Sequence, residues 1–174
     1  MTVTIRPRRE EDIPALAAVL VRVHELDGYP VEGVADPENW LRHDRELQSW
    51  TAVEDETPIG QIALIRAEPG DDAAHIWQEK TGGEFDDLTI PVRLFVHPDH
   101  RGTGAGELLM KAATSFARSR GLAVAFDVML KDRAAIRLYE RLGAHRIATM
   151  NHRYGNGLFE PAAVYIVPEN QKTA

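Results

Sequence analysis

The chain has 174 residues, of which 44% are hydrophobic and 27% are charged, a size and balance typical of one globular domain. It has no cysteine, which excludes disulfides, thiolate metal sites and a cysteine nucleophile. The formal net charge of −7 argues against general nucleic-acid binding, which needs a basic surface. We therefore expect a single domain over residues 1–174 that has no nucleic-acid partner.

Neither export nor membrane insertion is indicated by the hydropathy of the chain. Its first residues contain no apolar segment of the kind found in signal peptides, and no apolar run approaches the ~20 residues that span a bilayer. We therefore expect a cytoplasmic protein that is not associated with a membrane.

Short alternating and helical patterns fill the first half of the chain. Residues 3–6 alternate and predict a strand. Asp12 is placed to cap the helix that follows, and the turn residues from Asp27 to Pro30 end that helix. The remaining elements of this half are a helix over about 37–47 and a hairpin of two strands at 49–54 and 58–66.

The second half begins with residues 67–86, its least regular part, in which residues 75–77 fit one short helix. Pro91, inside a strand over 88–96, predicts a bulge or an edge. The later elements are a helix that ends at Gly121, a strand at 122–129, a helix from Asp132 to Gly143, and strands at 146–150 and 162–167. Because strands cluster in the middle of the chain, this order predicts a mixed α+β sheet.

The turn Arg101-Gly102-Thr103-Gly104-Ala105-Gly106 lies between a strand and a strongly apolar-faced helix. Its three glycines allow positive φ angles and let a ligand approach the backbone closely. The amides of such a turn and the helix N-terminus favour an anion, and Arg101 adds a cation suited to phosphate oxygens. The turn therefore predicts a phosphate or pyrophosphate site.

Two common nucleotide patterns do not fit this turn. The Walker pattern needs Gly-Lys-Ser/Thr, whereas Gly106 is followed by Glu107 and Leu108. The dinucleotide pattern needs a glycine three places after its second glycine, where this chain has Glu107 or Leu109.

The pattern Arg-x-x-Gly-x-Gly, preceded by Leu94-Phe95-Val96-x-Pro98, resembles the acetyl-CoA motif of the GNAT superfamily, the Gcn5-related N-acetyltransferases. The resemblance covers nearly the whole chain. It continues in Thr4-Ile5-Arg6-Pro7, Asp12-Ile13-Pro14-Ala15-Leu16, Phe126-Asp127-Val128 and Ala135-x-x-Leu138-Tyr139-Glu140-x-x-Gly143. It implies a mostly antiparallel mixed sheet of about seven strands, splayed at the fourth and fifth strands, with about four helices on its faces.

The resemblance also implies an acetyl-CoA-dependent N-acetyltransferase with no metal. Tyr139 matches the tyrosine that the family uses as a general acid toward the leaving thiolate, although its apolar neighbours also fit simple packing. Where family members often begin a helix with Asn, this chain has Asp132, which can cap the helix but is a poorer neighbour for phosphates. The cofactor-binding residues implied by the resemblance are Leu94, Phe95 and Val96 for the pantetheine arm, then Arg101, Gly102, Thr103, Gly104, Ala105, Gly106, Glu107 and Asp132.

No residue of the chain suggests an acyl-enzyme. There is neither a cysteine nor a Gly-x-Ser-x-Gly elbow, so direct attack by a bound amine in a ternary complex is expected. Deprotonating an alkylamine of pKa ~10 at pH 7 costs about 4 kcal/mol, which a base would ease. Several family members place a glutamate where this chain has Ile90-Pro91-Val92. The remaining candidates for a base, each also readable as a surface carboxylate, are Glu84, Asp86, Asp87 and Asp127.

The acceptor is expected to be an amine-bearing small molecule or a peptide amine. Tyr29, Trp40 and Trp77 either line its pocket or pack in the core. An acidic cluster near the same place either attracts an ammonium group or forms a solvated loop; its members are Asp27, Glu32, Asp36 and Glu38.

Three further alternatives concern function and assembly. A non-catalytic acyl-CoA-binding sensor or regulatory module would account for the same motifs. His97 and His100 have no third metal ligand at a recognisable spacing, so we expect them to flank the turn structurally. The edge strands and the last strand pair would allow a homodimer.

Overall fold

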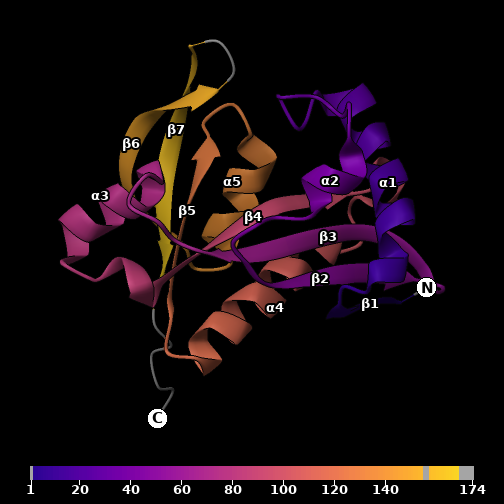
Figure 1. The fold of residues 1–174 in the computed structure, drawn as a ribbon, viewed down its shortest axis with the longest axis horizontal. Coiled ribbons are helices and arrows are strands. Elements are labelled where there is room, and N and C mark those ends of the chain that lie inside the picture. Colours follow the sequence, from indigo (N-terminus) through magenta and orange to yellow (C-terminus); the bar gives the residue numbers. More distant parts are fainter. Residues whose placement is uncertain (1, 155–156, 169–174) are drawn as a thin grey trace. The chain divides into compact units, whose positions relative to one another are not determined.

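The computed structural model describes residues 2–154 and 157–168, and contacts divide the chain into two compact units. Unit 1 comprises Met1–Ile65 and Pro91–Ala113, and unit 2 comprises Arg66–Ile90 and Thr114–Ala174. The elements of both units are labelled in Figure 1.

The strands of unit 1 begin with an antiparallel trio, β1 (Val3–Pro7), β2 (Glu46–Glu54) and β3 (Thr57–Arg66). The turn between β2 and β3 has two residues with positive φ, Asp55 at 48° and Glu56 at 65°. This is the pattern of a type I′ turn, whose twist matches that of the strands it joins. The hairpin expected here is therefore confirmed.

The helices of unit 1 are η1 (Glu10–Asp12), α1 (Ile13–Asp27) and α2 (Pro37–Leu41). Apolar positions at helical spacing place one face of α1 in the core. The buried cluster that α1 forms with α2 and the later strand β4 consists of Ile13, Leu16, Ala17, Val19, Leu20, Val23, Leu41 and Phe95.

Two expectations for unit 1 are wrong. The second helix ends at Leu41, not near Leu47, because β2 begins at Glu46 and pairs there with Ile65 of β3. Asp12 makes no capping hydrogen bond to α1. Its carboxylate is instead occupied by donors from β1, β2 and the backbone of Arg9.

The path between the units runs through β4 (Leu88–Val96), η3 (Pro98–His100) and α4 (Ala105–Ser119). The last six residues of β4, together with η3 and the first nine of α4, belong to unit 1. The positive φ in β4 falls at Arg93, at 57°, two residues beyond the proline that predicted an irregularity.

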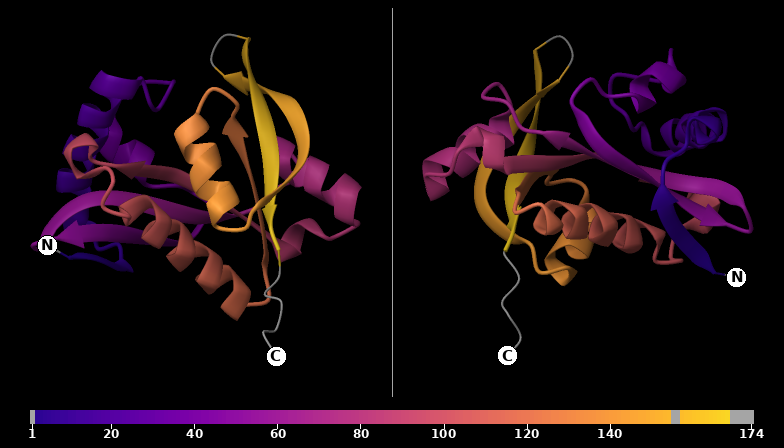
Figure 2. Two further views of the ribbon diagram at one scale, coloured as in Figure 1. Left: turned by 180° about the vertical axis from the view of Figure 1, so that it is seen from behind. Right: turned by 60° about the horizontal axis from the view of Figure 1, so that its bottom comes forward.

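Unit 2 contains α3 (Asp72–Thr81), η2 (Phe85–Asp87), β5 (Ala123–Met129), α5 (Arg133–Arg141), β6 (His145–Tyr154) and β7 (Leu158–Val167). The start of β4 pairs in parallel with β5 at two positions, Leu88 with Ala123 and Thr89 with Val124. β5 and β6 flank β7, both antiparallel to it. Within this unit, α3 and α5 lie on opposite sides of β5, β7 and β6 (Figures 1 and 2).

The described residues form seven strands in the hydrogen-bonded order β1-β2-β3-β4-β5-β7-β6. The predicted mixed and mostly antiparallel α+β sheet is confirmed, and the short β4–β5 ladder agrees with the expected splay. Five α-helices replace the four expected, because residues 72–81 form a full helix. β6 and β7 are both longer than the strands that the sequence predicted.

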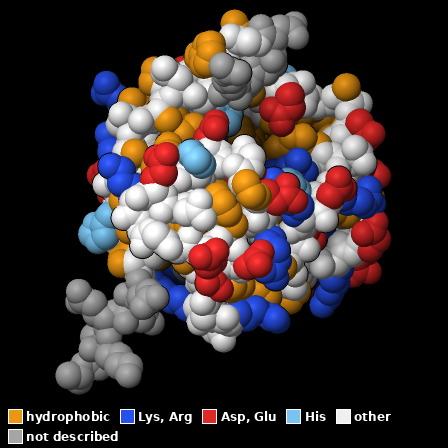
Figure 3. All heavy atoms as spheres, turned by 60° about the vertical axis from the view of Figure 1, so that its left-hand side comes forward, with side chains coloured by type: hydrophobic (Ala, Val, Ile, Leu, Met, Phe, Trp, Pro, Cys, Tyr) orange, Lys and Arg blue, Asp and Glu red, His pale blue; other side chains and the backbone are white. Residues whose placement is uncertain are grey.

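Surface charge is interspersed on the face shown in Figure 3, where acidic and basic side chains alternate with neutral ones. No helix among the described residues is long and apolar enough to cross a membrane.

Candidate functional site

The glycine turn before α4 is open on its outer side. Gly102 and Gly104 have φ angles of 80° and 85°, and no atom lies within 4 Å of the place where a Cβ would stand on either. The Thr103 hydroxyl donates to the His100 carbonyl oxygen at 2.7 Å, which closes the turn. All residues predicted to cradle a pyrophosphate, from Arg101 to Glu107, therefore lie in this turn or in the first helical turn after it.

The electrostatics of the turn suit an anion. The first N–H groups of a helix have no partner four residues back, and the helix dipole adds partial positive charge at that end. Glycines with positive φ leave the backbone approachable because they carry no side chain there. The residues present thus fit the pyrophosphate of acetyl-CoA.

Arg101 is engaged in an ion pair that the sequence did not predict. Its guanidinium contacts the Asp27 carboxylate at the end of α1, with both side chains at least 40% exposed. Exposed pairs of this kind contribute little free energy. The Arg101–Asp27 pair therefore adds little to the stability of unit 1.

The two histidines beside the turn bond to protein groups. The His97 imidazole accepts from the Asp99 amide at 3.0 Å, and Nδ1 of His100 contacts the Glu54 carboxylate. No group of three metal-ligating side chains occurs among the described residues. Both histidines flank the turn, as expected.

The predicted pantetheine strand alternates between buried and half-buried residues. Phe95 is in the core, whereas Leu94 and Val96 are half-buried. On the neighbouring strand, a Cβ on Gly60 would lie 2.5 Å from the Phe95 carbonyl oxygen. Gly60 therefore allows β3 to approach β4 closely at the segment predicted to bind the cofactor.

Tyr29 and Trp40, two of the aromatic residues that the sequence suggested for an acceptor pocket, pack together in unit 1. Trp40 lies edge-on to Tyr29, with ring centroids 5.8 Å apart, and its Nε1 donates to Glu32 at 2.6 Å. The Arg93 guanidinium lies 4.7 Å from the Trp40 ring, and burial lowers the pKa of Arg93. Trp77 belongs to unit 2, where it is buried on α3.

The acidic cluster does not act as one group. Asp27 pairs with Arg101, Glu32 accepts from Trp40, and Asp36 caps α2 by accepting from the Asn39 amide at 3.3 Å. These contacts give each of the three a local structural role.

Tyr139 lies on α5 in unit 2. Its ring meets that of Phe126 with centroids 4.6 Å apart. Burial raises the pKa of the Tyr139 phenol well above its usual value, and the charges of Asp132 and Asp127 raise it further. The hydroxyl therefore keeps its proton at neutral pH, the form that a general acid needs.

Asp132 caps α5, as the sequence predicted. Its Oδ1 accepts from the Ala135 amide at 3.1 Å. The contact satisfies one of the unpaired amides at the start of the helix and places a negative charge there.

The candidate bases differ in their surroundings. Glu84, Asp86 and Asp87 are exposed in and beside η2. Asp127 lies on β5, with Oδ2 3.1 Å from Nδ1 of His152 on β6. Sequence reasoning missed His152 because the strand predicted at 146–150 ended before it.

A second missed group is structural. The Tyr165 hydroxyl, on a fully buried ring, donates to Glu140 at 2.8 Å and accepts from Arg146 at 3.1 Å. Nothing in the local sequence pattern links these three residues, which come from β7, α5 and β6.

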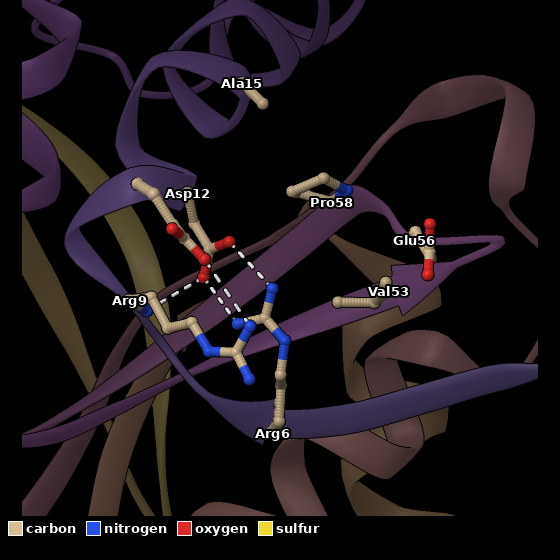
Figure 4. A pocket seen from close by; sticks show the side chains of 8 residues that line it. Arg6, Arg9, Asp12, Ala15, Val53, Glu56 and Pro58 are labelled. Atoms are coloured by element: carbon tan, nitrogen blue, oxygen red, sulfur yellow. Dashed lines mark hydrogen bonds and ion pairs between the residues drawn. The ribbon is translucent and has the colours of Figure 1, made fainter.

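An open pocket of about 420 Å³ lies in unit 1 beside β1, η1 and the β2–β3 turn (Figure 4). Within it, Asp12 accepts from both terminal nitrogens of Arg6 at 2.7 and 2.8 Å and from the backbone of Arg9 at 2.8 Å. Thr51 also donates to Asp12, at 3.0 Å. None of the predicted cofactor-binding residues lines this pocket, so we assign its ion pair to stability.

The chain is similar to known proteins in its family and in its fold. A family model described as the acetyltransferase (GNAT) family matches residues 14–144. No curated protein sequence matches the chain.

Solved structures share the fold at low sequence identity. The yncA structure from Salmonella typhimurium, with its cofactor acetyl-CoA, is 20% identical with a TM-score of 0.74, covering 100% of this chain and 98% of that one. Ribosomal-protein-alanine N-acetyltransferase from Brucella melitensis is 21% identical with a TM-score of 0.73, over 94% and 98%. Arabidopsis thaliana NAA60 in complex with a bisubstrate analogue is 18% identical with a TM-score of 0.69, over 95% and 97%.

Proposed function

The chain belongs to the acetyltransferase (GNAT) family and is an acetyl-CoA-dependent acyltransferase, and on that premise we propose that it acetylates the nitrogen of an amine acceptor directly, in a ternary complex. The observation that carries this proposal is the open turn of Gly102 and Gly104 at the start of α4. Such a turn supplies converging amides for a pyrophosphate.

Binding of the donor is assigned to residues of unit 1. The backbone of Leu94, Phe95 and Val96 would hold the pantetheine arm, and the amides of 102–107 would hold the pyrophosphate. Arg101 would turn from Asp27 to a phosphate oxygen. When bound, acetyl-CoA supplies the activated acetyl thioester.

Tyr139 is proposed to donate its phenolic proton to the departing sulfur. The observation that supports the assignment is its position on the second cofactor segment of the resemblance, and a tyrosine phenol holds its proton at neutral pH. Burial raises the pKa of this phenol further, so it would donate only as negative charge develops on the sulfur.

The test combines calorimetry with thiol release. Acetyl-CoA is titrated into the protein, and release of free thiol is then followed with spermidine, with free amino acids and with a short peptide that begins with alanine. Tyr139→Phe should bind acetyl-CoA normally and lose at least about 100-fold in rate, the lower end of the range of general acid catalysis. Arg137→Gln, exposed on the same helix, is the matched control.

The outcomes separate the alternatives. Binding without thiol release for every amine would favour a non-catalytic acyl-CoA-binding module. Failure to bind acetyl-CoA would refute both. An unchanged rate in Tyr139→Phe would remove the general-acid role alone.

A further inference from the structure

Arg93 is a half-buried cation at an irregular position of β4. Its φ of 57° lies in the left-handed region, which is uncommon for residues other than glycine and is costly unless the surroundings hold it. The Arg93 carbonyl oxygen accepts from Nε2 of the fully buried Gln61 at 3.2 Å, and Oε1 of Gln61 accepts from Arg8 at 2.9 Å. These contacts therefore fix the backbone that carries the guanidinium.

The guanidinium of Arg93 is itself held against Trp40. Its Nη1 donates to the carbonyl oxygen of Trp40 and, at 3.4 Å, to that of Arg42. Its central carbon lies 4.7 Å from the centre of the Trp40 ring. That ring is fixed in turn, because its Nε1 donates to Glu32 at 2.6 Å. Both ends of the Arg93 side chain are thus positioned by the surrounding protein.

Two donors of Arg93 are left over by these contacts. Among the described residues, its Nε and Nη2 make no hydrogen bond, and no carboxylate lies within 4 Å of the guanidinium. Nε and Nη2 share one edge of the planar group and form a fork that fits the two oxygens of a carboxylate. Burial lowers the pKa of Arg93 and outweighs the nearby acidic side chains. An anion bound at this edge would offset the cost of a half-buried, unpaired charge.

Arg93 directly precedes Leu94 to Val96, the residues proposed to hold the pantetheine arm. The turn proposed to hold the pyrophosphate, Gly102 to Glu107, lies beyond the other end of that segment. The thioester and the pyrophosphate stand at opposite ends of the pantetheine arm, so on this assignment the thioester would lie at the Arg93 end. All of these residues, and Trp40, belong to unit 1.

We propose that Arg93 binds a carboxylate of the acceptor, that the acceptor is a free amino acid, and that Trp40 positions the guanidinium for this contact. This inference rests on the proposed function. The amine and the carboxylate of an α-amino acid are attached to one carbon atom, so a carboxylate held at Arg93 would keep the amine near the thioester. A polyamine has no group for this fork, and its further ammonium groups would be repelled by it.

The first test compares matched acceptors by release of free thiol. The fastest free amino acid of the panel is measured beside its amide, which keeps the amine and the side chain but has no carboxylate. Arg93→Gln should lower kcat/KM for the amino acid about 10- to 100-fold, the range of hydrogen bonds to a charged group, chiefly through KM. For the amide, kcat/KM should change less than threefold. Arg93→Lys should shift the ratio between the two acceptors in the same direction by a smaller factor, because it keeps the charge without the fork.

Arg22→Gln is the matched control, since Arg22 is exposed on α1 and pairs with Glu25 at 3.2 Å. It should leave kcat/KM for both acceptors unchanged. A loss in Arg93→Gln that is equal for the amino acid and its amide would overturn the inference, because it would indicate a purely structural role. A wild-type protein that acetylates spermidine or the peptide faster than every free amino acid would overturn it as well.

The second test does not use turnover. The same amino acid is titrated calorimetrically into the protein saturated with CoA, which has no acetyl group to transfer. Arg93→Gln should bind the amino acid at least about 10-fold more weakly than the wild type does. Inorganic phosphate, titrated in its place, should bind the wild type more weakly than the amino acid.

The outcomes of this titration separate the two proposals. Equal affinities of the wild type and Arg93→Gln for the amino acid, or tighter binding of phosphate, would overturn the inference. A wild-type protein that binds acetyl-CoA and releases no thiol with any amine would instead overturn the proposed function, so the two failures are distinguishable.

Discussion

The buried carboxylate of Asp12 should make the protein sensitive to acid in a measurable way. Asp12 is 3% exposed, and its hydrogen bonds from Arg6, Arg9 and Thr51 outweigh the opposing effect of burial, lowering its pKa from 3.8 to about 2. At ~1.4 kcal/mol per pKa unit, this difference corresponds to ~2 kcal/mol of folding free energy. The pKa of Asp12 is lower in the folded state than in the unfolded state. Its contribution to the free energy of unfolding is therefore fully present above about pH 5 and is lost as the pH falls toward 2.

Asp12→Asn removes the charge but keeps the size of the side chain. We expect the variant to be less stable by ~2 kcal/mol or more at pH 7, because Arg6 also loses its partner. The difference from wild type should narrow as the pH falls from 5 to 3, since only the wild type loses this contribution. Urea unfolding followed by circular dichroism measures both proteins, with exposed Glu11→Gln as control. A stability difference that stays constant over this pH range would refute the reasoning.

Two further predictions concern glycines. Gly60→Ala should lower the free energy of unfolding by about 1–3 kcal/mol, because the new Cβ would lie 2.5 Å from the Phe95 carbonyl oxygen. Urea unfolding measures this, with Gly70→Ala as the control because a Cβ there would meet no atom within 4 Å. Equal free energies of unfolding in the two variants would contradict the prediction. Gly104→Val should weaken acetyl-CoA binding at least about 10-fold in calorimetry, since a φ of 85° is strained for a branched side chain and that side chain would stand in the proposed cradle. Gly70→Val is its control, and an unchanged affinity would remove the turn from the binding site.

Most of the fold follows from local patterns in the sequence. The apolar spacing of α1 and α4, the turn residues between β2 and β3, and the cap at Asp132 each depend on near neighbours in the chain. Such features can be predicted from the sequence because the spacing of apolar residues and the chemistry of helix caps involve residues that are close together in the chain. The wrong end of α2 has a tertiary cause, because pairing with β3 draws Glu46 into a strand.

The candidate site was predictable only where it is continuous in sequence. The turn from Arg101 to Glu107 is one segment, so its chemistry is visible in order. The contacts of Asp27 with Arg101 and of Asp127 with His152 join residues 74 and 25 positions apart. No spacing rule links such pairs: tertiary packing brings the end of α1 to the glycine turn, and strand order and register bring Asp127 to His152.

The cap at the start of α5 has a consequence for how the donor's phosphates are held. Asp132 fills the anion position of its own helix with a carboxylate, so that helix terminus has little positive potential to offer a second anion. On the proposed function, the glycine turn before α4 would then be the main phosphate site. An amide at position 132 would still cap α5 but would carry no charge, so Asp132→Asn would return positive potential to that helix terminus.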